Sequence, residues 1–233
     1  MKITVLSDDK ASKQRLVEKH SFSLYIERDS EIILFDLGVE SSVLEVNTAV
    51  LGLDLDIVDY AIVSHAHTPH YGGFKYLSQE APFVTVYIPF GTMESLGYTF
   101  RANGLKPVEV VKWIQLGGGV YLSKPYYGPP YEHFLVFDYN DGLIVVTGCL
   151  HPGVDALIDI SSYFKKRIKG VIGGLHLYNA PEEIIRDFTW KLVEKVNPDF
   201  IIPLHCSGRR IIDVLRKTSI KVLELKTGDS ITL

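Results

Sequence analysis

Short apolar segments without a helical period alternate with amphipathic segments along most of this chain. The apolar segments predict β-strands, and in the first half of the chain they span residues 2–6, 21–27, 31–35, 58–63 and 83–88. Residues 42–51 have an apolar stripe at helical spacing, so we expect a helix there. Ser42 and Glu45 predict a capping box at its start, and Gly52 predicts its end. Asn47 is a polar residue within that stripe and needs partners if it is buried, so it is expected to brace a nearby loop.

The second half of the chain begins with a long strand-rich stretch, residues 108–147. Within it, Asn140-Asp141-Gly142 predicts a hairpin between segments 133–138 and 143–147. Helices are then expected at residues 153–169, 181–196 and 209–217. The chain therefore has two α/β halves with no linker between them. We predict a single domain, residues 1–233, in which two β-sheets pack face to face under outer helices.

Composition narrows the classes of protein that this chain can belong to. The hydrophobic fraction of 46% and the charged fraction of 22% are those of a globular domain, and no apolar run is long enough for a membrane span. The net charge of −4 argues against a nucleic-acid partner. The first ten residues predict a strand rather than a signal peptide, and the two cysteines lack Cys-x-x-Cys spacing. A cytoplasmic protein without membrane or nucleic-acid partners is expected.

Three of the eight histidines, His65, His67 and His70, fall within six residues just after an apolar strand. Alternate side chains of an extended segment point the same way, so His65 and His67 can approach one point. Pro69 then bends the chain and lets His70 return to it. Neutral imidazole is the commonest metal ligand, and zinc favours nitrogen donors. This spacing therefore predicts a metal site.

Four separate apolar strands run into a histidine within a few residues. These histidines are His65, His151, His176 and His205. Ligand sites of α/β folds gather beyond the carboxyl ends of the strands, so we expect six of the eight histidines to line one site. Taken singly, a histidine at a strand end is often a loop residue that forms hydrogen bonds, and this alternative is strongest for His176. His20 and His133 have no such context and are expected to be structural or supporting.

The motif His65-Ala-His67-Thr-Pro69-His70 resembles the His-x-His-x-Asp-His signature of the metallo-β-lactamase superfamily. The segment Phe35-Asp36-Leu37-Gly38 is similar to the structural Asp-x-Gly turn of that superfamily. Further motifs together resemble the subfamily of dihydropterin ribofuranosyl-aminobenzene phosphate synthase-like hydrolases. They are Asn47, Glu132, Gly148-Cys149-Leu150-His151, Gly173-Gly174-Leu175-His176 and His205-Cys206-Ser207-Gly208.

The resemblance implies a four-layer αββα sandwich of two mixed β-sheets with a metal site, usually zinc and often binuclear. By this match His65, His67 and His151 hold the first ion, and His70 and His205 hold the second. Metal-bound hydroxide is then the nucleophile of a hydrolytic reaction. His176 is expected to act in catalysis by orienting the substrate or by stabilising developing negative charge.

Pro69 departs from the superfamily signature because it stands where the family has an aspartate. Proline has no ligand atom, so the carboxylate at the second metal is missing. Three possibilities remain: a single ion held by imidazoles, a second ion held with the thiolate of Cys149 or Cys206, or a degenerate site. We expect Cys149 to be a ligand, with a small buried hydrophobe as the alternative for both cysteines. One or two zinc ions are expected, and Mn, Fe or Ni remain alternatives.

The resulting hypothesis is a metal-dependent hydrolase of a small anionic substrate, a phosphate or carboxyl ester. Arg209 and Arg210 are candidates for contact with the anion, and a solvated helix start is their alternative role. Tyr126, Tyr127 and Tyr131 are candidates for an aromatic lid, or else anchor their loop. Two other functions stay open: a pterin-related synthase, and a metal-binding protein without catalysis.

Overall fold

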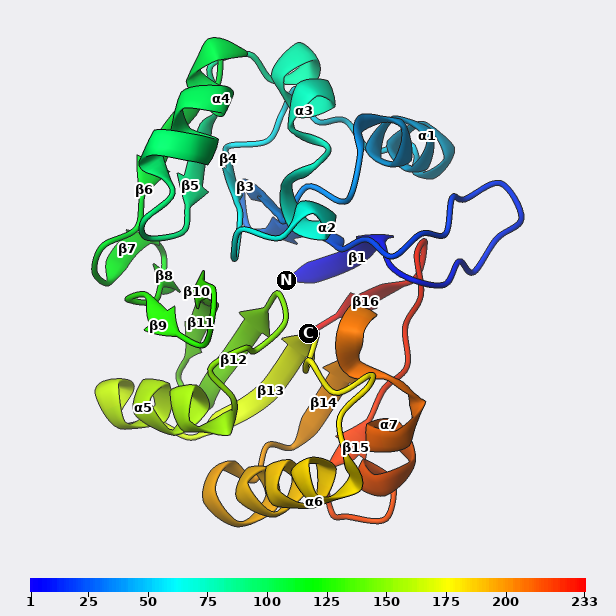
Figure 1. The fold of residues 1–233 in the computed structure, drawn as a ribbon, viewed down its shortest axis with the longest axis vertical. Helices are drawn as coiled ribbons and strands as arrows, with labels where there is room; N and C mark the ends of the chain where they lie inside the picture. Colours follow the sequence, from blue (N-terminus) through cyan, green and yellow to red (C-terminus); the bar gives the residue numbers. More distant parts are fainter. The chain divides into compact units, whose positions relative to one another are not determined.

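The structure, a computed structural model, describes all residues from 1 to 233. Contacts along the chain divide it into two compact units, Met1–Val110 with Leu225–Leu233, and Val111–Glu224. Each unit is built on one seven-stranded mixed sheet with helices against it (Figure 1). The predicted class, two mixed β-sheets flanked by helices, is confirmed. The single domain stays a prediction.

The sheet of the first unit has the strand order β16-β1-β2-β3-β4-β5-β6. Strands β16 to β3 pair antiparallel, and β3 to β6 pair parallel, so the carboxyl ends of β3, β4 and β5 lie at one edge. The strands are β1 (Lys2–Ser7), β2 (Ser23–Arg28), β3 (Glu31–Phe35), β4 (Tyr60–Ile62), β5 (Thr85–Ile88), β6 (Lys106–Glu109) and β16 (Ser230–Thr232). The helices are α1 (Ser41–Leu51), α2 (Thr68–Tyr71), α3 (Phe74–Glu80), η1 (Met93–Gly97) and α4 (Tyr98–Ala102).

The core of the first unit lies between this sheet and the helices α1, α3 and α4 (Figure 1). Leu44 of α1 and Leu77 of α3 are fully buried there against sheet residues such as Val86. Gly52 ends α1 in a left-handed conformation, as its position predicted. The predicted capping box is wrong, because α1 begins after Glu40 and the Ser42 hydroxyl donates to the Glu40 carboxylate.

The sheet of the second unit has the strand order β15-β14-β13-β12-β11-β8-β7. Strands β12 to β15 are parallel, and β7, β8 and β11 are antiparallel to their neighbours. The strands are β7 (Ile114–Gly117), β8 (Val120–Leu122), β11 (Leu135–Tyr139), β12 (Gly142–Thr147), β13 (Ile168–Gly173), β14 (Phe200–Pro203) and β15 (Lys221–Val222), with a separate hairpin of β9 (Tyr126–Tyr127) and β10 (Tyr131–Glu132). The helices are α5 (Val154–Phe164), α6 (Glu182–Lys191), η2 (Leu192–Val196), η3 (His205–Ser207) and α7 (Arg209–Leu215).

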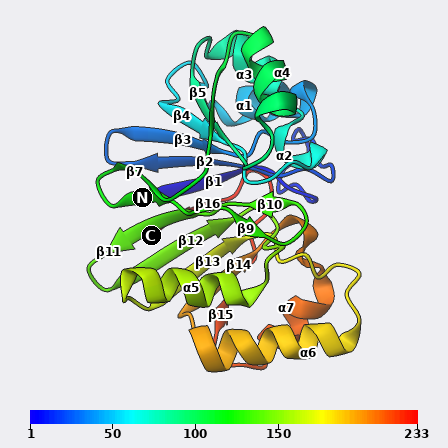
Figure 2. The same ribbon diagram turned by 60° about the vertical axis from the view of Figure 1, so that its left-hand side comes forward.

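Helices α5, α6 and α7 lie along one face of the second sheet (Figure 2). The core between them contains Val145 of β12, Leu157 of α5 and Ile211 of α7, all fully buried. Ile144 and Val146, on the other face of β12, are buried as well. Such a strand is covered on both faces, which explains why its sequence is uniformly apolar rather than alternating.

Two elements differ from the sequence-based expectations. The helix expected at residues 153–169 ends at Phe164, because Lys165 takes a left-handed φ of 53° and Ile168 already belongs to β13. A short helix, α2, forms within the histidine motif, and Pro69 lies in its first turn. The hairpin at Asn140-Asp141-Gly142 is confirmed, with Tyr139 paired to Gly142.

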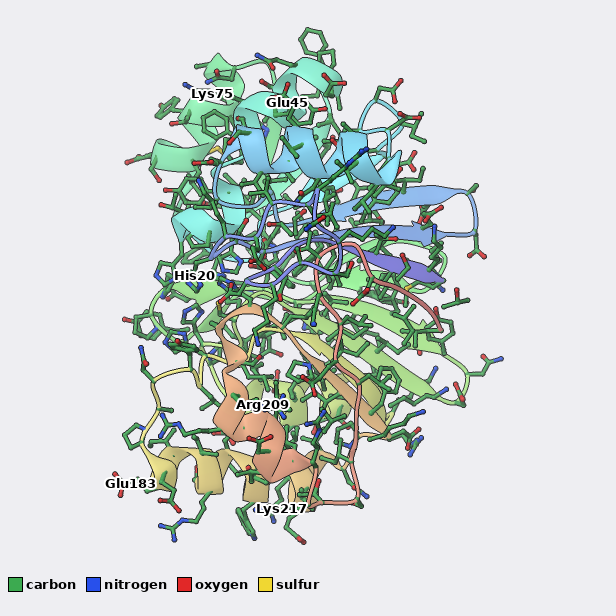
Figure 3. The ribbon with its side chains drawn as sticks, turned by 90° about the vertical axis from the view of Figure 1, so that its right-hand side faces the viewer. His20, Glu45, Lys75, Glu183, Arg209 and Lys217 are labelled. Atoms are coloured by element: carbon green, nitrogen blue, oxygen red, sulfur yellow. The ribbon has the colours of Figure 1, made fainter.

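The helices of both units carry charged side chains on their outer faces. Figure 3 shows Glu45 on α1, Lys75 on α3 and Glu183 on α6, and all three are exposed. No helix combines the length and the apolar character that crossing a membrane requires.

Asn47 joins α1 to two other segments of the first unit. Its side chain is completely buried. The Nδ2 group donates to Leu6 O at 2.9 Å and Val17 O at 3.2 Å, and Oδ1 accepts from Val17 N at 2.8 Å. This arrangement confirms the predicted bracing role, because the loop at Val17 has its backbone groups satisfied by one amide.

Replacing Asn47 by Leu is expected to lower the free energy of unfolding by about 2–4 kcal/mol, because it leaves buried backbone groups unpaired. Denaturant unfolding measures the change. The control is Val46→Asn on the exposed side of the same helix, which is expected to stay within about 0.5 kcal/mol of the parent chain. Equal stability of Asn47→Leu and the parent would contradict the bracing role.

Candidate functional site

In the first unit, the buried carboxylate of Asp36 holds the histidine motif in place. Asp36 follows β3 with a left-handed φ of 59° and is completely buried. Its Oδ1 accepts from Ser64 N at 2.7 Å, and its Oδ2 accepts from Ser64 Oγ at 2.8 Å. His70 Nδ1 lies 2.6 Å from the same Oδ2. The Asp-x-Gly turn expected from the resemblance thus positions the loop after β4.

These hydrogen bonds fix which ring nitrogens carry protons. An ionised carboxylate only accepts, so Nδ1 of His70 donates to Asp36. The Ser64 hydroxyl gives its single proton to Asp36, so its oxygen accepts from His65 Nδ1 at 2.9 Å. In their neutral forms, both imidazoles therefore carry the proton on Nδ1 and present the lone pair of Nε2. This is how metal-binding histidines are oriented in proteins.

The three histidines of the motif gather at one place in the first unit. The ring centroids of His65 and His70 are 4.0 Å apart, and those of His65 and His67 are 4.8 Å apart. His67 is exposed, whereas His65 and His70 are buried. Pro69 supplies no ligand atom, and its carbonyl accepts from Phe22 N at 3.0 Å. The predicted convergence of the three imidazoles is confirmed within this unit.

Two glycines allow α2 and α3 to approach the Asp36 turn closely. A Cβ atom on Gly72 would lie 1.8 Å from Val39 O, and one on Gly73 would lie 2.1 Å from Leu37 O. Leu37 N also donates to His70 O at 2.8 Å. The Tyr-Gly-Gly end of the motif is therefore required for packing, and it fixes the distance between the turn and the histidines.

In the second unit, Glu132 at the end of β10 plays the same part as Asp36 in the first. It is completely buried. Its Oε1 accepts from the Thr147 hydroxyl and from three successive backbone N–H groups, those of Gly148, Cys149 and Leu150, at 2.9–3.1 Å. Its Oε2 accepts from His151 N at 2.8 Å and from His151 Nδ1 at 2.9 Å. His151 in its neutral form thus also presents Nε2.

Sequence reasoning named Glu132 only as part of a resemblance and gave it no task, and it missed Ser64. An acidic residue in an apolar stretch just before a strand hairpin was the available indication for Glu132. Ser64 is marked only by its place before His65.

The carboxyl ends of the parallel strands β12, β13 and β14 bring a second cluster together. The Sγ atoms of Cys149 and Cys206 are 3.1 Å apart, and His176 N donates to Cys206 Sγ at 3.2 Å. Ring nitrogens of His151, His176 and His205 each lie within 4.8 Å of Cys149 Sγ. The second unit therefore brings together Cys149 and the three histidines that follow its strand ends.

The structure thus places the predicted residues in two groups. One contains His65, His67 and His70 in the first unit, and the other contains Cys149, His151, His176 and His205 in the second. That all six histidines line one site stays a prediction. His20 is exposed and its Nδ1 lies 3.2 Å from Asp9 Oδ2 (Figure 3).

Backbone strain and electrostatics mark the second group. Leu150, His176 and His205 take left-handed φ angles of 54°, 54° and 49°. Such angles cost of order 1 kcal/mol each and cluster at functional sites. The hydrogen bonds from Cys149 and His176 and the charge of His205 hold the pKa of Cys206 well below its usual range against the effect of burial. The hydrogen bond to Cys206 raises the pKa of His176.

The donor atoms of both groups fit a borderline metal ion. The first offers imidazole nitrogens, and the second offers imidazole nitrogens with thiol sulfurs. Zinc binds both kinds of ligand, and imidazole also suits iron, nickel and copper. The residues present are therefore compatible with metal binding, and they do not select one metal.

The arginines and tyrosines considered from the sequence have mostly structural contacts. Arg209 lies 3.0 Å from Asp213 and 3.2 Å from Glu224, and Figure 3 shows it at the start of α7. Arg210 donates to the carbonyl of Ala180 at 2.7 Å. The hydroxyl of Tyr126 donates to Asp159 at 2.6 Å. Tyr127 is 68% exposed and Tyr131 lies against it, with ring centroids 5.0 Å apart.

Known proteins resemble this chain over most of its length. The sequence model of the metallo-beta-lactamase superfamily matches residues 17–160. Two proteins of Methanocaldococcus jannaschii are similar. One is uncharacterized, 28% identical over 91% of this chain and 93% of that protein. The other, 7,8-dihydropterin-6-methyl-4-(beta-D-ribofuranosyl)-aminobenzene-5'-phosphate synthase, is 26% identical over 89% of this chain and 88% of that protein. The crystal structure of Tm1679, a metal-dependent hydrolase of the beta-lactamase superfamily, matches with a TM-score of 0.84 at 26% identity, over 100% and 99% of the two chains.

His133, beside Glu132, is a fully buried histidine. Neither of its ring nitrogens has a hydrogen-bond partner. Burial lowers its pKa to about 4, and the nearby charge of Glu132 opposes this shift only in part. The ring is therefore neutral in the folded protein at neutral pH.

Replacing His133 by Phe is expected to weaken the acid sensitivity of the fold. In the unfolded chain, His133 binds a proton as the pH falls below the ordinary histidine pKa of about 6.5. In the folded chain it stays neutral until the pH reaches about 4, so the proton favours the unfolded chain between these values. The native protein thus loses stability over this window, by an amount on the order of 3 kcal/mol. Denaturant unfolding at pH 7.5 and pH 4.5 measures the loss. An equal loss in His133→Phe and the parent would show that another group causes it.

Proposed function

This chain belongs to the metallo-beta-lactamase superfamily, and from that premise we propose that it is a metal-dependent hydrolase of a small anionic substrate, a phosphate or carboxyl ester. One observation carries the proposal: buried acceptors hold Nδ1 of His65, His70 and His151. Each imidazole is thereby set to offer Nε2 as a ligand. A fold that needed histidines only for packing would have no reason to fix three of them in the same tautomer.

The proposed ligands follow the family match and the geometry of each unit taken separately. His65, His67 and His151 hold the first ion. His70, His205 and Cys149 serve the second position. Zinc is the proposed metal, with one or two ions, and Mn, Fe and Ni are the alternatives that the donor atoms allow.

The chain's own residues orient these ligands and meet the substrate. When bound, a divalent ion supplies an activated water and polarises a carbonyl or phosphoryl oxygen. Asp36 and Glu132 fix the tautomers and increase the basicity of the imidazoles that they contact. His176 is exposed, and it orients the substrate or stabilises negative charge that develops on it.

A second candidate function rests on the relative named 7,8-dihydropterin-6-methyl-4-(beta-D-ribofuranosyl)-aminobenzene-5'-phosphate synthase, which is 26% identical. In that case the same histidines serve a pterin condensation, and Tyr127 with Tyr131 contacts the ring. Product analysis separates the two functions, since a hydrolase consumes water and releases an alcohol, whereas the synthase joins two substrates.

Turnover of model esters tests the proposal directly. Zinc-loaded protein is expected to hydrolyse bis(p-nitrophenyl) phosphate or p-nitrophenyl acetate. The variant His67→Ala, which removes an exposed imidazole of the motif, is expected to lose at least about 100-fold in rate. Bound metal without turnover would favour a non-catalytic metal protein. Equal turnover by both proteins would show that the activity does not come from this site.

Pro69→Asp is expected to strengthen the second metal position by restoring the carboxylate that the family signature has. Elemental analysis should show a gain approaching about one equivalent of metal per chain, with a higher rate of hydrolysis. Pro69→Ala, which removes the ring without adding a ligand, is the matched control and should leave the stoichiometry unchanged. If the aspartate variant equals the parent in both measurements, Pro69 does not limit the second position.

Glu132→Gln is expected to lower metal affinity by about 10–100-fold, because the amide cannot accept from every donor that the carboxylate holds. The control is Glu109→Gln in the first unit, where Glu109 also accepts backbone N–H groups, those of Thr92 and Met93. Competition with a chelating dye measures both affinities. Equal losses in the two variants would mean that Glu132 acts through general stability alone.

A further inference from the structure

Cys149, His176 and Cys206 form a compact cluster within the second unit. Each follows the carboxyl end of a different parallel strand, β12, β13 or β14. Their ligand atoms all lie within 4.8 Å of one another, and the two sulfurs are 3.1 Å apart. Cys149 is only 3% exposed and Cys206 only 8%, whereas His176 reaches solvent. Two sheltered sulfurs therefore face an imidazole at an accessible edge.

The backbone builds this cluster independently of the three side chains. Leu177 N and Tyr178 N both donate to Cys206 O at 3.0 Å, and Leu204 N donates to Gly173 O at 3.0 Å. A Cβ atom on Gly174 would lie 2.7 Å from Cys206 Sγ and 2.4 Å from Gly148 O. The three strand ends can close only because residue 174 has no side chain.

The sulfur of Cys206 already has the surroundings of a metal-bound thiolate. His176 N donates to it at 3.2 Å, and such hydrogen bonds are the usual outer partners of metal-bound sulfur. His176 takes its left-handed φ of 54° while making this contact. The strained backbone thus keeps both the N–H group and the imidazole of one residue beside the sulfur.

We propose that Cys149, Cys206 and His176 form a thiolate-rich site for a borderline divalent ion such as zinc. Two sulfurs on one tetrahedral zinc ion lie about 3.8 Å apart, so the pair needs to open by less than about 1 Å. Two thiolates and one imidazole leave a fourth position for water or substrate.

This inference deepens the proposed function, because Cys149 is shared with the second metal position. The site adds the sulfur of Cys206 as a second thiolate beside that of Cys149. It also gives His176 a ligand role in place of direct contact with the substrate.

Cobalt(II) provides the test, because cobalt bound to thiolate absorbs strongly in the near ultraviolet and cobalt bound to imidazole alone does not. Metal-free protein in a phosphine reductant, which keeps both thiols reduced, is titrated with cobalt(II). The parent is expected to show the band, Cys206→Ser about half of it, and the Cys149→Ser, Cys206→Ser double variant none. His176→Ala is expected to bind cobalt at least about tenfold more weakly while it keeps the band. Ser207→Ala, in the same loop, is the control and should match the parent.

Two outcomes would overturn the site. One is cobalt binding without the band. The other is a band that depends on Cys149 and is unchanged in Cys206→Ser, which would assign Cys149 to the histidine set alone. Should Cys206→Ser fail to fold, zinc-edge X-ray absorption of the parent gives the answer without a variant. Two sulfur neighbours at about 2.3 Å are expected, and none or one would refute the proposal.

The histidine variant keeps this inference separate from the proposed hydrolase. His67→Ala is expected to lose ester hydrolysis and retain the cobalt–thiolate band. If the parent protein hydrolyses esters but shows no cobalt–thiolate band, the sulfur site is refuted and the proposed hydrolase is not. If the parent protein shows the band but hydrolyses no ester, the sulfur site is supported and the proposed hydrolase activity is refuted.

Discussion

A buried carboxylate must have its oxygens satisfied, and in each unit this requirement shapes the loop that carries the candidate ligands. Asp36 and Glu132 are both completely buried, where an ionised carboxylate without partners would cost several kcal/mol. Asp36 takes its donors from the start of the histidine motif, and Glu132 takes them from the loop after β12. The same hydrogen bonds that stabilise the charge orient the imidazoles. Fold and ligand geometry therefore depend on one interaction, repeated in each unit.

Sequence patterns predicted the features that depend on neighbouring residues. The hairpin at Asn140-Asp141-Gly142 is confirmed because turn chemistry is local. The helix at 153–169 was extended too far because Ile168 continues its apolar spacing, although it lies in β13. The chain turns at Lys165, which adopts a left-handed φ. Lysine has no preference for this conformation, so the sequence does not predict the turn. Local pattern thus gives the type of an element more reliably than its end.

The site follows the same division between local and distant information. His65, His67 and His70 could be identified because their spacing alone brings them together. The role of Glu132 as the acceptor for the loop after β12 could not be predicted from the sequence. Its donors lie 15 to 19 residues further along the chain and reach it only because β11 and β12 pair. The pair of sulfurs likewise depends on the order of β12, β13 and β14, which brings Cys149 and Cys206 together from 57 residues apart. Sheet order is not encoded in any single segment.

Pro69 gives these arrangements a chemical consequence. With proline at position 69, the motif itself carries no carboxylate. The buried carboxylate of Asp36 contacts Nδ1 of His70, which leaves Nε2 of that ring as the possible ligand atom. An ion held by neutral imidazoles alone keeps its full positive charge and attracts anions, whereas thiolates neutralise most of that charge. If an ion is held by histidines alone, as proposed for the first position, it would therefore be the stronger Lewis acid and the better partner for an anionic substrate. An ion held by two thiolates would be better suited to holding a ligand in place than to activating it.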